Sequence, residues 1–182
     1  MNSPLRANSC KETAVLDYNR NMGFRPAFSV LMAVLSAVGC GSPLDVESAL
    51  RVTQVSSGWF DAGLDSLGRN KLVPTVSFRL ENMTQSQVSY LQLLGKFQRQ
   101  NEEEEWGNAF IRVVGTEGLE AGRATDLMRL ESERGYTGEQ SRAEMLSHGD
   151  FVDVTMEVFI KHRAEQWTYL DSVDVSRRLL TE

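Results

Sequence analysis

The chain has 182 residues, of which 24% are charged, and a formal net charge of −6 at pH 7. Four of the 19 basic residues and two of the 25 acidic residues precede Cys40, which leaves 15 and 23 and a net charge of −8 for the rest of the chain. Nucleic acids and anionic lipid surfaces both attract basic patches, so this acidic balance argues against either as an electrostatic partner of the part after Cys40.

Residues 1–39 have the anatomy of a secretory signal peptide. No charged residue occurs between positions 26 and 44, Arg20 and Arg25 precede this span, and small residues follow its apolar core. A basic flank, a short apolar run and a small-residue cleavage zone are typical of exported proteins. Met22 would begin a more compact leader, so the sequence leaves open whether translation starts at Met1 or at Met22.

The sequence Ala-Val-Gly-Cys that ends at Cys40 resembles the lipobox of bacterial lipoproteins. In that family Leu is most common where Ala37 stands here. The resemblance implies that Cys40 receives a diacylglyceryl group and that residues 40–47 form a lipidated tether. It also implies a cell-envelope location at the outer membrane, because Gly41 rather than Asp follows the cysteine. An uncleaved membrane anchor is the alternative, since the apolar run approaches the roughly 20 residues that span a bilayer.

Residues 48–182 are predicted to form one all-β domain. Period-two alternation between turn residues is the signature of a half-buried strand. Seven segments carry strand signals, namely 50–55, 76–81, 88–97, 110–114, 125–130, 151–161 and 167–175. The segment 88–97 is apolar on both faces in places, which is typical of a central strand.

One segment predicts a helix. Thr137 and Gln140 have the spacing of a capping box, helix formers follow them, and Gly149 is placed to end the helix. Two or three helical turns make a crossover rather than a layer. The sequence therefore predicts an immunoglobulin-like antiparallel β-sandwich of about seven strands with one short crossover helix. Cys10 and Cys40 are the only cysteines, so the domain is expected to fold without a disulfide.

The segment 76–84, followed by 88–93, resembles the immunoglobulin-like domains of FxLYD type found in bacterial lipoproteins. The shared feature is a strand that ends in an Asn-x-Thr turn and leads into an aromatic-bearing strand. The Tyr-Asp that ends the naming motif of this family is absent, and residues 94–97 stand in its place. The resemblance implies a sandwich and transfers no catalytic residue.

The sequence predicts no catalytic or metal site. His148 at the end of the predicted helix suits the helix dipole, and His162 lies among basic residues just past a strand. The acidic run 102–105 lacks the ligand spacing of a calcium loop and is typical of a solvated turn. No Gly-x-Ser-x-Gly nucleophile elbow occurs. We therefore expect a non-enzymatic protein that needs no cofactor and no metal.

The three tryptophans have different expected roles. Trp106 and Trp167 lie at or near strand starts, which predicts core packing. Trp59 and Phe60 lie in the segment 56–71, whose Gly, Asp and Ser residues predict a long loop. Because large aromatic side chains in loops often anchor interfaces, Trp59 and Phe60 are the candidate contact surface.

Two hypotheses of function follow. The first is a lipid-anchored cell-envelope protein, held at the membrane through Cys40, that acts through contact with an envelope protein as an assembly or accessory factor. The second is a periplasmic or surface module that binds a small ligand or glycan through the loop 56–71. The second hypothesis requires Trp59 to line an aromatic pocket, so a buried Trp59 contradicts it.

Overall fold

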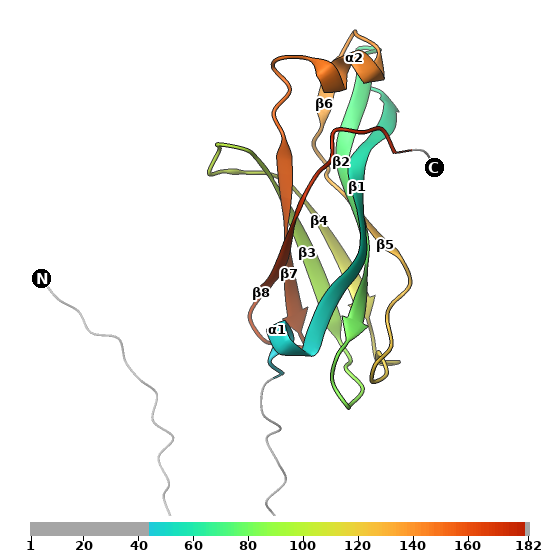
Figure 1. The fold of residues 1–182 in the computed structure, drawn as a ribbon, viewed down its shortest axis with the longest axis vertical. Coiled ribbons are helices and arrows are strands. Elements are labelled where there is room, and N and C mark those ends of the chain that lie inside the picture. The colour runs from blue at the N-terminus through green and yellow to red at the C-terminus, as the bar shows by residue number, and fades with distance from the viewer. Residues whose placement is uncertain (1–43, 181–182) are drawn as a thin grey trace, which may run out of the picture. The chain divides into compact units, whose positions relative to one another are not determined.

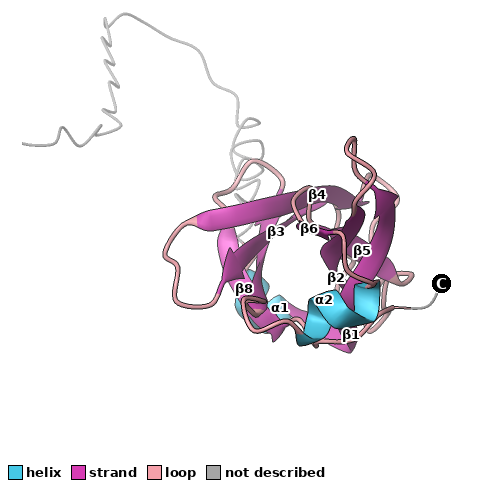
Figure 2. Cartoon of the chain, turned by 90° about the horizontal axis from the view of Figure 1, so that it is seen from above, coloured by secondary structure: helices cyan, strands magenta, loops and turns pink. Residues whose placement is uncertain are grey.

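The computed structural model describes residues 44–180, and Cys40 and the predicted signal peptide lie outside the described residues. Within residues 44–180 the chain forms two antiparallel sheets of four strands each, packed face to face, with short helices at opposite ends (Figures 1 and 2). The predicted all-β antiparallel sandwich is therefore confirmed. The strands of this described part number eight rather than seven, because residues 136–138 form a short strand that the sequence did not predict.

The first sheet is built around strand β2 (Asn70–Asn82), which pairs with three other strands: β1 (Leu50–Leu64), β5 (Met128–Glu131) and β6 (Tyr136–Gly138). The second sheet has the strand order β4-β3-β7-β8, with bounds β4 (Glu105–Val114), β3 (Leu91–Arg99), β7 (Val154–His162) and β8 (Thr168–Asp174). The predicted central strand 88–97 is confirmed as β3, which lies between β4 and β7.

Two short helices complete the described chain. Helix α1 (Val46–Ala49) precedes β1, and helix α2 (Arg142–Ser147) connects β6 of the first sheet to β7 of the second. The predicted crossover role of the helix is therefore confirmed. Val46, which the sequence placed in a tether, is 4% exposed and packs on the core, so the folded domain already includes residues before position 48.

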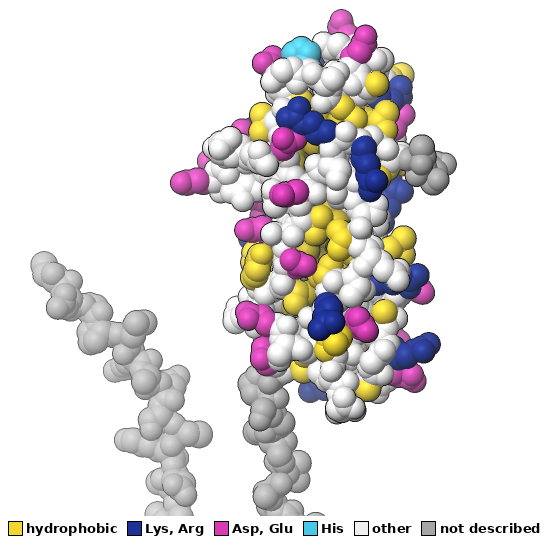
Figure 3. Space-filling view, viewed as in Figure 1, with side chains coloured by type: hydrophobic (Ala, Val, Ile, Leu, Met, Phe, Trp, Pro, Cys, Tyr) yellow, Lys and Arg dark blue, Asp and Glu magenta, His cyan; other side chains and the backbone are white. Residues whose placement is uncertain are grey.

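Two clusters of buried side chains fill the space between the sheets. The larger cluster includes Trp59, Phe97 and Met156, and the smaller one includes Leu91 and Ile160. Burying each large apolar side chain of this kind contributes about 1.5–3 kcal/mol. On the face that carries β8 and β1, Figure 3 shows apolar side chains in the strip between these two strands and charged side chains to either side.

The predicted loop 56–71 is wrong. Strand β1 continues to Leu64, β2 begins at Asn70, and a short turn joins them. Asp65 holds this turn, because its Oδ1 accepts the backbone N–H groups of Leu67 and Arg69, both at 2.9 Å. The Gly, Asp and Ser residues of β1 are tolerated because β1 is an edge strand of its sheet, and residues 54–56 are exposed to solvent.

The capping box of the helix also differs from the prediction. Ser141 Oγ accepts the backbone N–H of Glu144, and the Glu144 carboxylate accepts the backbone N–H of Ser141 at 2.9 Å. Thr137 belongs to strand β6 instead, where it pairs with Lys71. The helix has its C-cap at His148, so Gly149 follows the helix end as predicted, but Gly149 does not take the left-handed φ of a glycine C-cap.

Strand β8 confirms the predicted strand 167–175, but the predicted core packing of Trp167 is wrong. The pairing of β7 with β8 shifts between Val158 and Phe159, so that Leu170 is an extra residue on β8. Such a bulge reverses the alternation on one side of it. Leu170 packs against the core, whereas Tyr169 is 46% exposed and Trp167, predicted to be a core residue, is 36% exposed.

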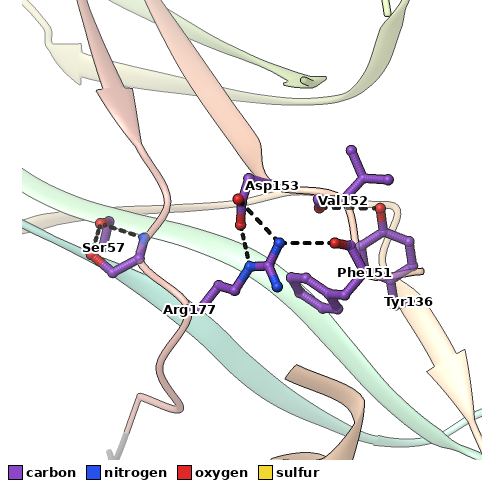
Figure 4. A network of polar contacts seen from close by, with 7 residues as sticks. Ser57, Tyr136, Phe151, Val152, Asp153 and Arg177 are labelled. Atoms are coloured by element: carbon purple, nitrogen blue, oxygen red, sulfur yellow. Dashed lines mark hydrogen bonds and ion pairs between the residues drawn. The ribbon is translucent and has the colours of Figure 1, made fainter. Parts of the chain in front are cut away.

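The C-terminal segment runs from β8 to the edge of the first sheet, where it lies beside β1 (Figure 1). The Trp59 N–H donates to the Arg178 carbonyl at 2.8 Å, and the Leu180 N–H donates to the Trp59 carbonyl at 2.9 Å. Figure 4 shows how the segment is held: the guanidinium of Arg177 contacts the carboxylate of Asp153 and donates to the Phe151 carbonyl at 2.9 Å. The segment therefore links the two sheets.

Candidate functional site

The predicted contact residues do not form a surface. Trp59 is 0% exposed, and its ring packs against Phe151, Tyr136 and Trp106 at centroid distances of 4.6, 5.5 and 6.5 Å. The neighbouring Phe60 points to the other face of β1, where the Arg129 guanidinium covers its ring at 4.1 Å. The expected contact surface is therefore wrong at Trp59, and so is the hypothesis of a ligand pocket in segment 56–71. Cys40 lies outside the described residues.

The second sheet carries an apolar row on its outer face, the face turned away from the core. Leu94 is directly opposite Phe110 on one side and Phe159 on the other, and Phe159 is opposite Tyr169. These four side chains, here called the apolar row, cross the whole sheet from β4 to β8. The terminal members of the row are well exposed, Phe110 at 56% and Tyr169 at 46%.

Aromatic and basic side chains extend the apolar row. The ring of Trp167, just before β8, packs edge-on against Phe110 at 6.2 Å. Lys96 Nζ lies 5.0 Å from the ring centroid of Phe159, and Lys161 Nζ lies 5.9 Å from that of Trp167. A cation over an aromatic face is attracted by the ring quadrupole, so these lysines border the row without removing it from solvent.

A groove of about 730 Å³ lies at one end of the same sheet, where β3 begins, β4 ends and β7 has just ended. It is lined by Tyr90, Gln92, Arg112, Val113, Val114, Gly115, Thr116, Glu117 and Arg163. A volume of this size is in the range of small-molecule sites. None of these residues was singled out by the sequence, because they come from three separate parts of the chain.

The backbone of the groove is strained at two residues. Tyr90 and Arg163 have left-handed φ angles of 57° and 53° although neither is glycine. Each such residue costs about 1–2 kcal/mol. The two residues touch, since the Arg163 N–H donates to the Tyr90 carbonyl at 2.9 Å, and the Tyr90 N–H donates to the Gly115 carbonyl at 3.0 Å. Strain of this kind clusters at functional sites.

A β-bulge shapes the opposite wall. Leu91 pairs with Val114, but Gln92 pairs with Arg112, so Val113 is an extra residue on β4. Bulges are over-represented next to functional sites, where they redirect a side chain. Here the bulge places Arg112 beside Gln92 on the outer face of the sheet.

The charge of the groove is positive. Among residues 44–180, neither Arg112 nor Arg163 makes an ion pair or a side-chain hydrogen bond. The acid in the groove, Glu117, is engaged locally: its Oε1 accepts the Gly115 N–H at 2.7 Å, and this bond lowers the pKa of its carboxyl below the ordinary value. The arginines therefore face solvent with their donors unused by the described chain.

In the range 44–180, no group of three or more His, Cys, Asp and Glu side chains is arranged to hold a metal ion. No helix in that same range is long and apolar enough to cross a membrane.

Comparison with known proteins identifies no relative of this chain. No protein-family model matches this chain, and no curated protein and no solved structure matches it either. The resemblances to the lipobox and to FxLYD-type domains stay predictions.

Proposed function

We propose that this chain is a non-enzymatic protein, exported and held at the cell envelope by a lipid on Cys40, which acts through contact with an envelope protein as an assembly or accessory factor. The observation that supports the contact is the apolar row on the outer face of the second sheet, with Phe110 56% exposed at one end and Tyr169 46% exposed at the other.

The apolar row is unusual for an outer face. An antiparallel sheet with one face on the core normally turns polar side chains to water on the other. Contiguous apolar patches on a soluble surface mark interaction sites, and aromatic side chains are enriched at the centres of protein interfaces. Phe110, Phe159, Trp167 and Tyr169 supply such aromatic side chains on one face.

The rows beside the apolar row indicate the chemistry of the partner. Arg112 and Lys161 lie in the next row on one side, each opposite Gln92, while Lys96 lies opposite Glu157 in the next row on the other side. Lys96 Nζ also lies 3.7 Å from the carboxylate of Glu105. Among residues 44–180, the unpaired positive charge beside the aromatic centre therefore comes from Arg112 and Lys161. A matching partner presents apolar side chains flanked by carboxylates, since opposite charges at an interface rim steer association.

The proposed anchor restricts where this partner is found. With the lipid on Cys40, the described domain begins four residues later at Leu44. Four residues span at most about 14 Å when fully extended. The domain then works close to the membrane surface, within reach of proteins embedded in or attached to that membrane.

The test is site-specific photo-crosslinking in cells that carry the full chain. A photo-crosslinking amino acid at Phe110 or at Tyr169 is expected to give the same discrete protein adduct, because both positions face one partner. The control position is Leu67, which is 75% exposed in the turn between β1 and β2. The proposed contact is contradicted if the crosslinker at Leu67 gives the same adduct in equal yield as the crosslinker at Phe110. It is also contradicted if neither Phe110 nor Tyr169 gives an adduct.

The anchor is tested separately by Cys40→Ser. The variant is expected to leave the membrane fraction, because no diacylglyceryl group is then attached. A variant that still sediments with membranes contradicts the lipid anchor and favours an uncleaved apolar anchor. This outcome leaves the crosslinking result intact, so the two halves of the proposal are tested independently.

A further inference from the structure

We propose that the groove between Tyr90, Arg112 and Arg163 is a binding site for the oxyanion of a small molecule, a carboxylate or a phosphate. The proposal does not depend on the proposed function, because the groove lies at the end of the sheet beside the apolar row and includes none of its four side chains, although Arg112 borders both. Three observations carry it: the conformation of the backbone, the charge of the walls and the exposed aromatic ring at the rim.

The backbone of the groove is strained at two residues, Tyr90 and Arg163. Tyr90 and Arg163 adopt left-handed φ angles of 57° and 53° and are joined to each other by a backbone hydrogen bond of 2.9 Å. Glycine adopts such a φ angle freely, whereas tyrosine and arginine adopt it at a steric cost. Keeping a tyrosine and an arginine at these positions places an aromatic ring and a guanidinium at the rim of one cavity.

The charge of the groove favours an oxyanion. The chain after Cys40 has a net charge of −8, yet two arginines line this cavity and neither has an ion pair among residues 44–180. Glu117, the lining acid, already accepts the backbone N–H of Gly115 at 2.7 Å. A guanidinium presents parallel N–H donors that match a carboxylate or a phosphate, so arginine is suited to bind either group.

The remaining walls suit the body of a small molecule. Tyr90 is 49% exposed and offers a ring face, and Gln92 offers amide donors and an acceptor beside Arg112. The cavity of about 730 Å³ is large enough for a sugar-sized or amino-acid-sized ligand together with water. The ligand class is therefore a small organic acid or phosphate ester rather than a bare ion.

The experiment is titration calorimetry of the full chain in detergent with three matched probes: glucose, glucuronate and glucose 6-phosphate. They share one body and differ in carrying no anion, a carboxylate or a phosphate. At least one of the two charged sugars is expected to bind, whereas glucose is expected not to bind. Binding of glucuronate alone identifies a carboxylate site, and binding of glucose 6-phosphate alone identifies a phosphate site.

Variants then assign the binding to the groove. Arg112→Gln and Arg163→Gln are each expected to lower the affinity for the charged probe by about tenfold or more, which is the size of one charge-assisted contact. Arg123→Gln is the matched control, because Arg123 is an exposed arginine outside the groove. Circular dichroism verifies that each variant is folded. The proposal is overturned if neither charged sugar binds, if glucose binds equally, or if binding survives both groove variants.

Discussion

Arg163 donates its backbone N–H to the carbonyl of Tyr90 at 2.9 Å, and both residues hold left-handed φ angles. Two strained residues that touch make one rigid corner at the mouth of the groove. The corner ties the end of β7 to the residue before β3, and a second hydrogen bond, from the Tyr90 N–H to the Gly115 carbonyl, ties it to the loop after β4.

The first prediction is that Arg163→Gly stabilises the fold. Glycine adopts a φ of 53° without the steric cost that arginine carries. Part of this gain is offset by the greater chain entropy of glycine in the unfolded state, so the free energy of unfolding rises by about 0.5–1 kcal/mol. Urea denaturation of the two proteins measures the difference.

The control for this prediction is Arg123→Gly. Arg123 is an exposed arginine in a loop, but its φ is not left-handed, so glycine there only adds unfolded-state entropy. It is expected to lower the free energy of unfolding by about 0.5–1 kcal/mol. Equal losses in both variants would mean that the corner at Arg163 stores no strain.

The sequence predicted best those parts of the fold that one buried face dictates. In β7 the residues Val154, Met156, Val158 and Ile160 are buried and alternate with partly exposed ones, and this strand lies in the predicted segment 151–161 except for its last residue. The loop predicted for the segment 56–71 is wrong, because Gly, Asp and Ser residues are typical of loops but also occur in this edge strand. An edge strand, however, accepts polar residues on its solvent face.

The site could not be predicted, for two physical reasons. The groove joins Tyr90, Arg112 and Arg163, and strand pairing between distant segments decides that these residues meet. Residue type also does not reveal a left-handed tyrosine or arginine, because such residues are usually Gly, Asn or Asp. The apolar row could be predicted in part, because Phe110, Phe159 and Tyr169 all lie in predicted strands. The bulge at Leu170, which the sequence does not reveal, decides that Tyr169 shares a face with the other two.

The second prediction separates the two faces of the second sheet. Phe110→Ser, on the outer face, is expected to change the free energy of unfolding by less than about 0.5 kcal/mol, because a ring that is 56% exposed has little packing to lose. Phe97→Ala, on the inner face at 0% exposure, is expected to cost about 3–5 kcal/mol. Urea denaturation measures both.

The same pair of variants bears on the proposed contact. Phe110→Ser, although folded, is expected to abolish the adduct formed by a crosslinker placed at Tyr169. If the adduct persists at its original yield, the apolar row is not the binding surface. A large loss of stability in Phe110→Ser would instead show that the row is structural.

The third prediction concerns the C-terminal segment. A Cβ at Gly58 would lie 2.8 Å from Leu180 Cδ2 and 2.9 Å from the Arg178 carbonyl oxygen. Gly58→Ala therefore pushes the segment away from β1 and is expected to cost about 1–3 kcal/mol, as overpacking does. Hydrogen exchange is expected to accelerate at the Trp59 and Leu180 amides, whose hydrogen bonds join β1 to the C-terminal segment.

Gly149→Ala is the matched control for Gly58→Ala. A Cβ at Gly149 has no neighbour within 4 Å, and its backbone is not left-handed. Its effect on the free energy of unfolding is expected to stay within about 0.5 kcal/mol. Protected amides at Trp59 and Leu180 in Gly58→Ala would show that the segment adapts without separating from β1.

The fourth prediction is a pH dependence at the junction of β1 and helix α2. Hydrogen bonding to Arg142 lowers the pKa of Asp61 below its ordinary value of 3.8. The unfolded chain therefore binds a proton at Asp61 more readily than the folded one does. The resulting stability is fully present above pH 3.8 and is lost as the pH falls through the lower pKa of the folded state.

Asp61→Asn measures this contribution directly. At neutral pH the variant is expected to be less stable than the wild type by about 0.5 kcal/mol, the size of a solvent-screened ion pair, and the difference is expected to shrink at about pH 2.5. Asp126→Asn is the control, since Asp126 is exposed and makes no ion pair or side-chain hydrogen bond within residues 44–180. A difference between wild type and Asp61→Asn that is constant with pH would show that the pair with Arg142 does not hold helix α2 against β1, because only an ionised Asp61 can make it.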